Sequence, residues 1–145
     1  MKVKECMSRN IWFCSPDDSI SDVAKIMKEK HVGCIPICNT ERCVVGILTD
    51  RDIVLRSVAC DKNVENKKIS DIMTCNPMCC DLNDEISDIT KLMSRTGIRR
   101  IPVTENGNLI GMLTVGDFAI HPNITQECVG ATMENICKCN EKNNS

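Results

Sequence analysis

The feature that most constrains this chain is an internal repeat, because a repeated sequence predicts a repeated structural unit. The segment "GILTDRD" at residues 46–52 returns as "GMLTVGD" at residues 111–117. Upstream, residues 7–36 align with residues 73–102, and a one-residue deletion in the following turn keeps the later segments in register. The identical pairs are Met7/Met73, Asn10/Asn76, Cys14/Cys80, Asp18/Asp84, Ile20/Ile86, Ser21/Ser87, Asp22/Asp88, Lys25/Lys91, Met27/Met93, Ile35/Ile101 and Pro36/Pro102. The chain is therefore two copies of one unit followed by a tail.

Each copy predicts the element order β-α-β-β-α. A short strand near 12–14 or 78–80 precedes an amphipathic helix, for which Asp18 and Asp84 are the expected N-caps. A hairpin follows, over 34–38 and 43–49 or over 101–104 and 109–114. The second helix begins at the threonine of Thr-x-x-Asp. The apolar helix positions recur at i, i+3, i+4 and i+7, at Ile20, Val23, Ala24 and Met27, and at Ile86, Ile89, Thr90 and Met93.

These elements predict an α+β fold. We expect a first copy over 1–59, a polar linker over 60–69, a second copy over 70–122, and a C-terminal helix and tail over 123–145. In the last segment, 123–138 has helical spacing and 139–145 is expected to fray. One copy is too small to bury both faces of its sheet, so we expect two copies packed sheet to sheet about a pseudo-twofold axis.

Charge and composition exclude several classes of function. A formal net charge of −2 argues against general nucleic-acid binding. No apolar run reaches the length of a membrane span, and the first residues have no apolar stretch of signal-peptide type, so we expect a cytoplasmic protein without a membrane partner. The chain has twelve cysteines. Without a secretion signal, they are expected to be reduced thiols that pack as small hydrophobic side chains. Their spacing predicts no metal site, although Cys137-x-Cys139 leaves a thiol or metal response open.

The repeated Thr-x-x-Asp has two interpretations. As a capping box, the threonine accepts from the aspartate backbone and the aspartate reaches back to the threonine backbone. As a ligand site, the helix N-terminus and the threonine hydroxyl would face a phosphate, and the carboxylate would accept hydrogen bonds from two ribose hydroxyls. Gly46 and Gly111 would then lack a side chain where another backbone or a ligand comes close.

Taken together, the segments "CMSRN…SPDDSISDVAKIMKEKHVGCIPICN…VVGILTDRDIV" and "IMTCNPMCCDLNDEISDITKLMSRTGIRRIPVTENGNLIGMLTVGDF" carry a family resemblance. The chain resembles a pair of cystathionine-β-synthase (CBS) domains, a Bateman module, over nearly its whole length, and it is similar to the stand-alone bacterial members. The resemblance implies two β-α-β-β-α repeats with two clefts between their sheets. It also implies adenosine nucleotides as common ligands and dimers as a common assembly.

The resemblance further implies roles for individual residues. Asp52 and Asp117 would hold ribose hydroxyls, with Thr49 and Thr114 towards the phosphates. Backbone groups at the strand starts would line the adenine slot, beside aliphatic side chains that serve equally as core. Arg99 and Arg100 precede the second copy's strand where the first copy has Gly33 and Cys34, so the two clefts are expected to be unequal. The implied ligand-binding residues are Ile11, Trp12, Phe13, Ile35, Pro36, Thr49, Arg51, Asp52, Pro77, Met78, Cys79, Arg99, Arg100, Ile101, Pro102, Thr114 and Asp117.

The leading hypothesis is a regulatory module that senses AMP, ADP or ATP and signals to an effector protein of unknown identity by conformational or dimer rearrangement. A homodimer is expected, and no cofactor is required. His31 and His121 are isolated, so no catalytic residues and no enzyme activity are expected. The alternatives are a ligand-free dimerisation scaffold, in which Thr-x-x-Asp is only a cap, and a thiol- or metal-responsive protein.

Overall fold

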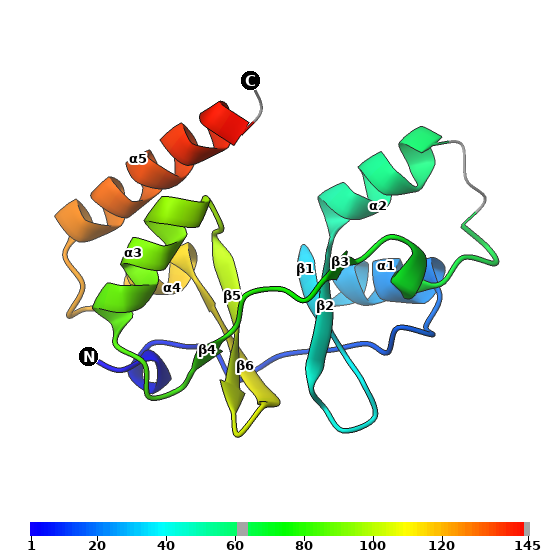
Figure 1. Ribbon diagram of the computed structural model, residues 1–145, viewed down its shortest axis with the longest axis horizontal. Helices are drawn as coiled ribbons and strands as arrows, with labels where there is room; N and C mark the ends of the chain where they lie inside the picture. Colours follow the sequence, from blue (N-terminus) through cyan, green and yellow to red (C-terminus); the bar gives the residue numbers. More distant parts are fainter. Residues whose placement is uncertain (61–63, 144–145) are drawn as a thin grey trace. The chain divides into compact units, whose positions relative to one another are not determined.

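The computed structural model describes residues 1–60 and 64–143. Its helices and strands alternate as the repeat predicts, with an additional long helix at the C-terminal end (Figure 1). In chain order they are η1 (Val3–Glu5), α1 (Ile20–Lys30), β1 (Cys34–Cys38), β2 (Val44–Thr49), α2 (Asp50–Arg56), η2 (Val58–Cys60), η3 (Ile69–Asp71), β3 (Thr74–Cys75), β4 (Cys80–Asp81), α3 (Ile86–Thr96), β5 (Arg100–Glu105), β6 (Asn108–Thr114), α4 (Val115–Ile120) and α5 (Gln126–Asn143).

The chain forms two compact units, which we name after the repeat that dominates each. The first-repeat unit comprises residues 12–77 and 107–109, and the second-repeat unit comprises residues 1–11, 78–106 and 110–145. Each unit contains one three-stranded sheet, in the order β1-β2-β3 or β4-β5-β6. The α+β class and the β-α-β-β-α repeat are therefore as the sequence predicts.

In the first-repeat unit, α1 covers the hairpin of β1 and β2. The predicted apolar face of α1 is buried at Ile20, Val23 and Met27, and Ala24 is half-buried. These side chains pack with the inward residues of the strands and with η3, in a cluster that includes Ile35, Ile37, Leu48, Ile69 and Ile72. Ile69 is fully buried and Val64 packs against the same cluster, so part of the predicted linker at 60–69 belongs to this unit's core. Residues 61–63 of that linker lie outside the described residues.

In the second-repeat unit, α3 repeats this arrangement and α5 is added to it. All four predicted positions of α3 are buried, at Ile86, Ile89, Thr90 and Met93. The core combines them with strand residues, with Phe118 of α4 and with Ile136 of α5, and both of the last two are fully buried. The C-terminal helix is thus part of this unit's core.

The leading segment of each repeat completes the unit of the other repeat. Ser8 and Met112 exchange two backbone hydrogen bonds, of 2.9 and 3.0 Å, which place residues 1–11 along β6. In the first-repeat unit, β3 pairs with β2 in the same way, with Thr74 opposite Ile47. The side chain of Val3 is fully buried in the second-repeat core, as Ile69 is in the first.

These close approaches explain the repeated glycine. A Cβ atom on Gly111 would lie 2.6 Å from the backbone oxygen of Ser8, and one on Gly46 would lie 3.2 Å from that of Thr74. The contact at Gly111 is shorter than real Cβ atoms show, so the neighbour that requires this glycine is another backbone of the same unit. At Gly46 the backbone contact is tight, and the Cβ atom would also lie 2.5 Å from Sδ of Met73, so a side chain and a backbone of the same unit both fill the space.

Three local predictions were wrong or incomplete. The N-caps are Ser19 and Glu85, one residue after the predicted Asp18 and Asp84, because each of these aspartates instead accepts a turn hydrogen bond, from the N–H of Ser15 or of Asp81. The predicted first strands shrink to a single bridge at Cys14 and to the two residues of β4.

The C-terminal helix continues through Asn143, although 139–145 was expected to fray. Two contacts hold its last turns on the end of α3. The Asn140 amide donates to the Gly97 carbonyl at 3.2 Å, and the Cys139 thiol donates to the Arg95 carbonyl at 3.3 Å. Across the described parts of the chain, no helix combines the length and the hydropathy that crossing a bilayer requires.

Candidate functional site

Both Thr-x-x-Asp segments form capping boxes. In the first repeat, the Thr49 hydroxyl accepts from the Asp52 N–H at 3.1 Å, and Oδ2 of Asp52 accepts from the Thr49 N–H at 3.0 Å. Thr114 and Asp117 repeat this pair at 3.2 and 2.8 Å. The structural interpretation of the motif is therefore correct for both copies, and a ligand role would have to use the atoms that the cap leaves over.

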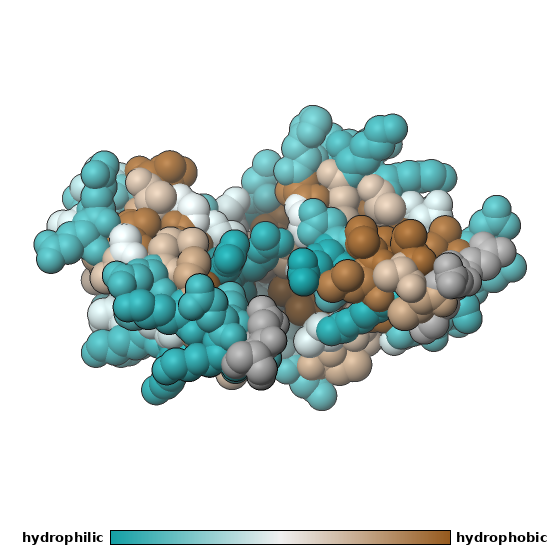
Figure 2. All heavy atoms as spheres, turned by 90° about the horizontal axis from the view of Figure 1, so that it is seen from above, coloured by the Kyte–Doolittle hydropathy of each residue, from teal (hydrophilic) through white to brown (hydrophobic). Residues whose placement is uncertain are grey.

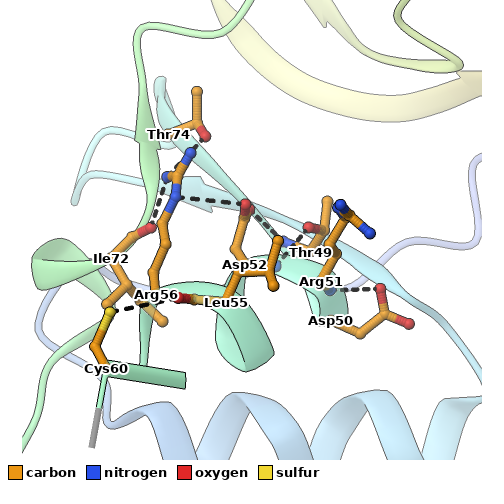
Figure 3. A network of polar contacts seen from close by, with 9 residues as sticks. All are labelled: Thr49, Asp50, Arg51, Asp52, Leu55, Arg56, Cys60, Ile72 and Thr74. Carbon is orange, nitrogen blue, oxygen red and sulfur yellow. Dashed lines mark hydrogen bonds and ion pairs between the residues drawn. The ribbon is translucent and has the colours of Figure 1, made fainter. Parts of the chain in front are cut away.

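In the first repeat, Arg56 occupies the remaining oxygen of the aspartate. Its Nε atom lies 3.8 Å from Oδ1 of Asp52, and its Nη1 atom donates to the carbonyl of Ile72 at 3.0 Å and to the hydroxyl of Thr74 at 3.2 Å. In Figure 3, this arginine lies between the Asp52 carboxylate and its two other partners, Ile72 before β3 and Thr74 on β3. Arg56 is not among the predicted site residues, although its spacing of four residues from Asp52 on one helix indicates an ion pair.

In the second repeat, one carboxylate oxygen of Asp117 accepts both hydrogen bonds that Thr114 donates to it. Oδ2 of Asp117 accepts from the N–H of Thr114 and also from its hydroxyl, at 3.1 Å. Among the described residues, none donates to Oδ1 of Asp117. The position equivalent to Arg56 is His121, whose Nδ1 atom accepts from the Asn123 N–H at 3.2 Å. Asp117 is half-buried and keeps one carboxylate oxygen for a further donor.

The residue before the hairpin lies directly against the start of the capped helix in both repeats. The Arg99 carbonyl accepts from the Val115 N–H at 3.0 Å, and the Gly33 carbonyl accepts from the Asp50 N–H at 3.0 Å. The structure therefore brings Arg99 and its neighbour Arg100 to the end of α4 that carries Thr114 and Asp117.

The charges at the two helix starts differ. In the first repeat, a Cβ atom on Gly33 would lie 2.9 Å from Oδ2 of Asp50, so a carboxylate occupies the place where the second repeat has an arginine side chain. Arg51 is exposed in the first turn of α2, and its backbone N–H donates to Asp50 (Figure 3). An anion at the first repeat would meet two carboxylates together with Arg51 and Arg56, whereas at the second repeat it would meet two arginines and one carboxylate.

The aromatic residues expected at the adenine slot are accessible. Trp12 is half-buried, with the ammonium of Lys30 at 5.6 Å from its ring centre, and Phe13 is 43% exposed, with the guanidinium of Arg42 at 5.0 Å. In the second repeat, Met78 and Cys79 are exposed. Ile11 and Pro77 are half-buried.

The aliphatic candidates lie in the core. Ile35 and Ile101 are 1% and 0% exposed and belong to the hydrophobic cluster of their own unit, and Pro36 and Pro102 are also buried. Their role in packing is therefore clear, and their side chains present almost no surface to a ligand in this conformation.

The buried cysteines behave as hydrophobic side chains. Cys14 and Cys80 are 4% exposed. Burial, reinforced by neighbouring carboxylates, raises the pKa of the Cys14 thiol to about 11 and that of Cys80 to about 12. Burial also raises the pKa of Cys6 to about 11, with a smaller contribution from the charge of Asp117. Cys6 is therefore a neighbour of the second-repeat site that the motif alone does not indicate.

Within residues 1–60 and 64–143, no group of three His, Cys, Asp or Glu side chains is arranged to hold a metal ion. His31 is exposed and ends α1 in a left-handed conformation, and His121 ends α4.

Comparison with known proteins gives consistent matches. The family model for the CBS domain matches residues 3–58 and 69–122. The protein YlbB of Bacillus subtilis is 35% identical over 136 residues, which cover 93% of this chain and 90% of YlbB.

Two solved structures are informative. The CBS domain pair of protein MJ0100, crystallised with 5-methylthioadenosine and S-adenosyl-L-methionine, has a TM-score of 0.73 and 27% identity, over 82% of this chain and 93% of that chain. Hypoxic Response Protein I, whose crystal structure holds two coordinated zinc ions, has a TM-score of 0.76 and 26% identity, over 83% of this chain and 98% of that chain.

Proposed function

Because this chain belongs to the CBS domain family, whose paired domains are regulatory modules, we propose that it senses an adenosine-containing nucleotide of the AMP, ADP and ATP class. The proposed site is the helix start of the second repeat, with Asp117 and Thr114 on α4 and with Arg99 and Arg100 before and in β5. Binding would favour one arrangement of the module over another, and this change would be read by an effector protein.

The observation that carries the proposal is the state of Asp117. Its Oδ2 atom takes both bonds from Thr114, and its Oδ1 atom has no donor among the described residues. A half-buried carboxylate oxygen of this kind is an acceptor for the hydroxyl groups of a ribose. The two arginines beside it offer forked donors for phosphate oxygens.

The adenosine class is supported by the relative rather than by side chains alone. The MJ0100 domain pair binds 5-methylthioadenosine and S-adenosyl-L-methionine, both of which contain adenosine. In this chain, Arg99 and Arg100 add positive charge at the proposed site, which favours a ligand with phosphate groups. We therefore expect AMP, ADP or ATP to bind more tightly than the two ligands of MJ0100.

A homodimer is the proposed form in which the module acts. Val54, Leu55 and Val58, on α2 and η2, are 54%, 47% and 61% exposed. Figure 2 shows hydrophobic surface gathered over this part of the chain. Such a patch on a protein of this size favours association through it.

The test is calorimetric titration of the purified chain with AMP, ADP, ATP, S-adenosyl-L-methionine and 5-methylthioadenosine. The critical variant is Asp117→Ala, and its matched control is Asp52→Ala, which removes the same capping carboxylate where Arg56 already occupies it. We expect Asp117→Ala to weaken nucleotide binding at least about tenfold, which is about 1.4 kcal/mol, and Asp52→Ala to leave it within about twofold.

Two outcomes contradict the proposal. If no adenosine compound binds at millimolar concentration, both Thr-x-x-Asp segments are caps only and the dimerisation scaffold becomes the better interpretation. If Asp52→Ala abolishes binding and Asp117→Ala does not, the first repeat is the site. Zinc or iron bound in stoichiometric amount to untagged protein would instead favour the thiol- or metal-responsive alternative.

A further inference from the structure

A second concentration of positive charge lies in the groove between α3 and α5, away from the Thr-x-x-Asp residues. The two helices run side by side in Figure 1 and border an open groove of about 570 Å³. Four basic side chains line it, Lys91 and Arg95 from α3 and Lys138 and Lys142 from α5. The other described lining residues carry hydroxyl, amide or thiol groups, and none of the lining residues is acidic. We call this site the α3–α5 groove.

The sequence builds this groove from two pairs of like charges. Lys91 and Arg95 are four residues apart on one helix, and Lys138 and Lys142 are four residues apart on the other. Residues at this spacing are neighbours on a helix surface, and like charges there destabilise the helix. Glu134 relieves part of this repulsion, because its carboxylate pairs with Lys138 at 2.6 Å and raises the pKa of that lysine; Glu141 adds a smaller effect. A bound anion would be attracted to all four basic side chains.

The walls of the groove are fixed in place. Ile136 of α5 is fully buried in the second-repeat core, and Thr132 is 4% exposed. At the far end, Asn140 and Cys139 bond to the carbonyls of Gly97 and Arg95, at 3.2 and 3.3 Å. The basic side chains therefore extend from two helices whose separation is set by packing and by hydrogen bonds.

We propose that the α3–α5 groove binds a small polyanion that carries two or more phosphate groups. The lining offers ammonium and guanidinium donors, with hydroxyl and amide groups between them, so it matches a ligand that is rich in acceptors and multiply charged. The formal net charge of the whole chain is −2, so this basic cluster is a local feature and not a reflection of overall charge.

The first repeat does not carry the same set of basic residues. The residue equivalent to Lys91 is Lys25 of α1, but the residue equivalent to Arg95 is Glu29, and α5 follows only the second repeat. The internal repeat thus supplies a matched control, since Lys25→Glu and Lys91→Glu make the same charge change at equivalent helix positions. The proposal is independent of the nucleotide site, because the two share no residue.

The experiment is a calorimetric titration of the full chain with sodium tripolyphosphate at low ionic strength. We expect saturable binding that Lys91→Glu and Arg95→Glu each weaken at least about tenfold and that Lys25→Glu changes less than about twofold. Asp117→Ala, which tests the nucleotide site, is expected to bind tripolyphosphate as the unaltered chain does. Thermal unfolding of each variant shows whether it folds. Lys91→Gln replaces Lys91→Glu if the Lys91→Glu variant does not fold.

A second readout uses Cys139, which lines the groove. Trypsin cleavage after Lys138 and Lys142 places Cys139 in its own peptide, so its alkylation rate can be followed by mass spectrometry. Tripolyphosphate is expected to slow alkylation of Cys139 in the unaltered chain but not in Arg95→Glu. The proposal is overturned if Lys25→Glu and Lys91→Glu weaken binding equally, if only Arg99→Ala or Arg100→Ala weakens it, or if no saturable binding occurs at millimolar tripolyphosphate.

Discussion

The Nε atom of Arg56 lies 3.8 Å from Oδ1 of Asp52, four residues before it on α2. The equivalent pair in the second repeat is His121 and Asp117, and no hydrogen bond or ion pair joins these two described residues. The two capping boxes are alike, but among the described residues an arginine faces the Oδ1 atom of the capping aspartate only in the first repeat. This difference is the basis for assigning unequal roles to the two repeats.

The contacts of Arg56 predict a stability effect. Arg56→Ala removes donors to the Ile72 carbonyl and to the Thr74 hydroxyl as well as the ion pair. Because the arginine side chain is 49% exposed, solvent screens the ion pair, and we expect the free energy of unfolding to fall by about 1 kcal/mol. Urea denaturation measures this. His121→Ala is the matched control and is expected to lower the free energy of unfolding by less than about 0.5 kcal/mol. An equal loss for both variants would show that the contacts of Arg56 do not stabilise the fold.

The glycine that faces Ser8 predicts a larger effect. Gly111→Ala would place a Cβ atom 2.6 Å from the Ser8 backbone oxygen. Since two paired backbones cannot separate without breaking their hydrogen bonds, we expect a loss of about 1–3 kcal/mol in unfolding free energy, measured by denaturation.

The control for this substitution is Gly130→Ala. Gly130 lies in α5, and a Cβ atom there would meet nothing within 4 Å. Alanine is the better helix former, so we expect a gain of up to about 1 kcal/mol. A loss at Gly130 similar to that at Gly111 would contradict the steric explanation.

The raised pKa of Cys80 predicts a dependence of stability on alkaline pH. The ordinary pKa is 9.0 and the folded-state pKa is about 12, so the unfolded chain loses this proton first. Stability from this group is complete below pH 9 and is lost as pH rises from 9 towards 12. Urea denaturation at pH 8 and pH 10.5 is expected to show a larger fall for the unaltered chain than for Cys80→Ala. Identical falls would mean that the thiol is not held neutral by folding.

The apolar side chains on α2 predict an effect on assembly. Val54→Glu and Val58→Glu place charges in the exposed patch that we assign to a homodimer interface. Light scattering coupled to size-exclusion chromatography is expected to give a dimer mass for the unaltered chain and a monomer mass for each variant. Lys68→Glu changes charge elsewhere on the same unit and is expected to remain dimeric. A monomeric unaltered chain would contradict the interface.

The sequence predicted the fold well because most of it is encoded by periodic burial. The faces of α1 and α3, the two hairpins and both Thr-capped helices follow from local spacing, and they are present as expected. The N-caps at Ser19 and Glu85 were missed because Asp18 and Asp84 satisfy a turn that precedes the helix. The last turn of α5 was missed because its support comes from Gly97 and Arg95, more than forty residues earlier in the chain.

The candidate site was less predictable than the fold. Spacing alone indicated the capping boxes, but the occupation of Asp52 by Arg56 depends on where Ile72 and Thr74 lie, which is a tertiary property. The proximity of Cys6 to Asp117 has the same origin, since residues 1–11 pack on the second repeat. The burial of Ile35 and Ile101 could be expected, because apolar residues in a strand covered by a helix are more often core than ligand contacts.

The exchange of leading segments has a consequence for how this chain can be divided. A fragment that ends after α2 retains Val3 and Ser8, whose partners lie beyond its end, and it lacks Ile69 and Ile72, which complete its own core. Cutting the chain between the repeats would therefore expose apolar surface in both parts, because each part would lose a segment that packs in its core.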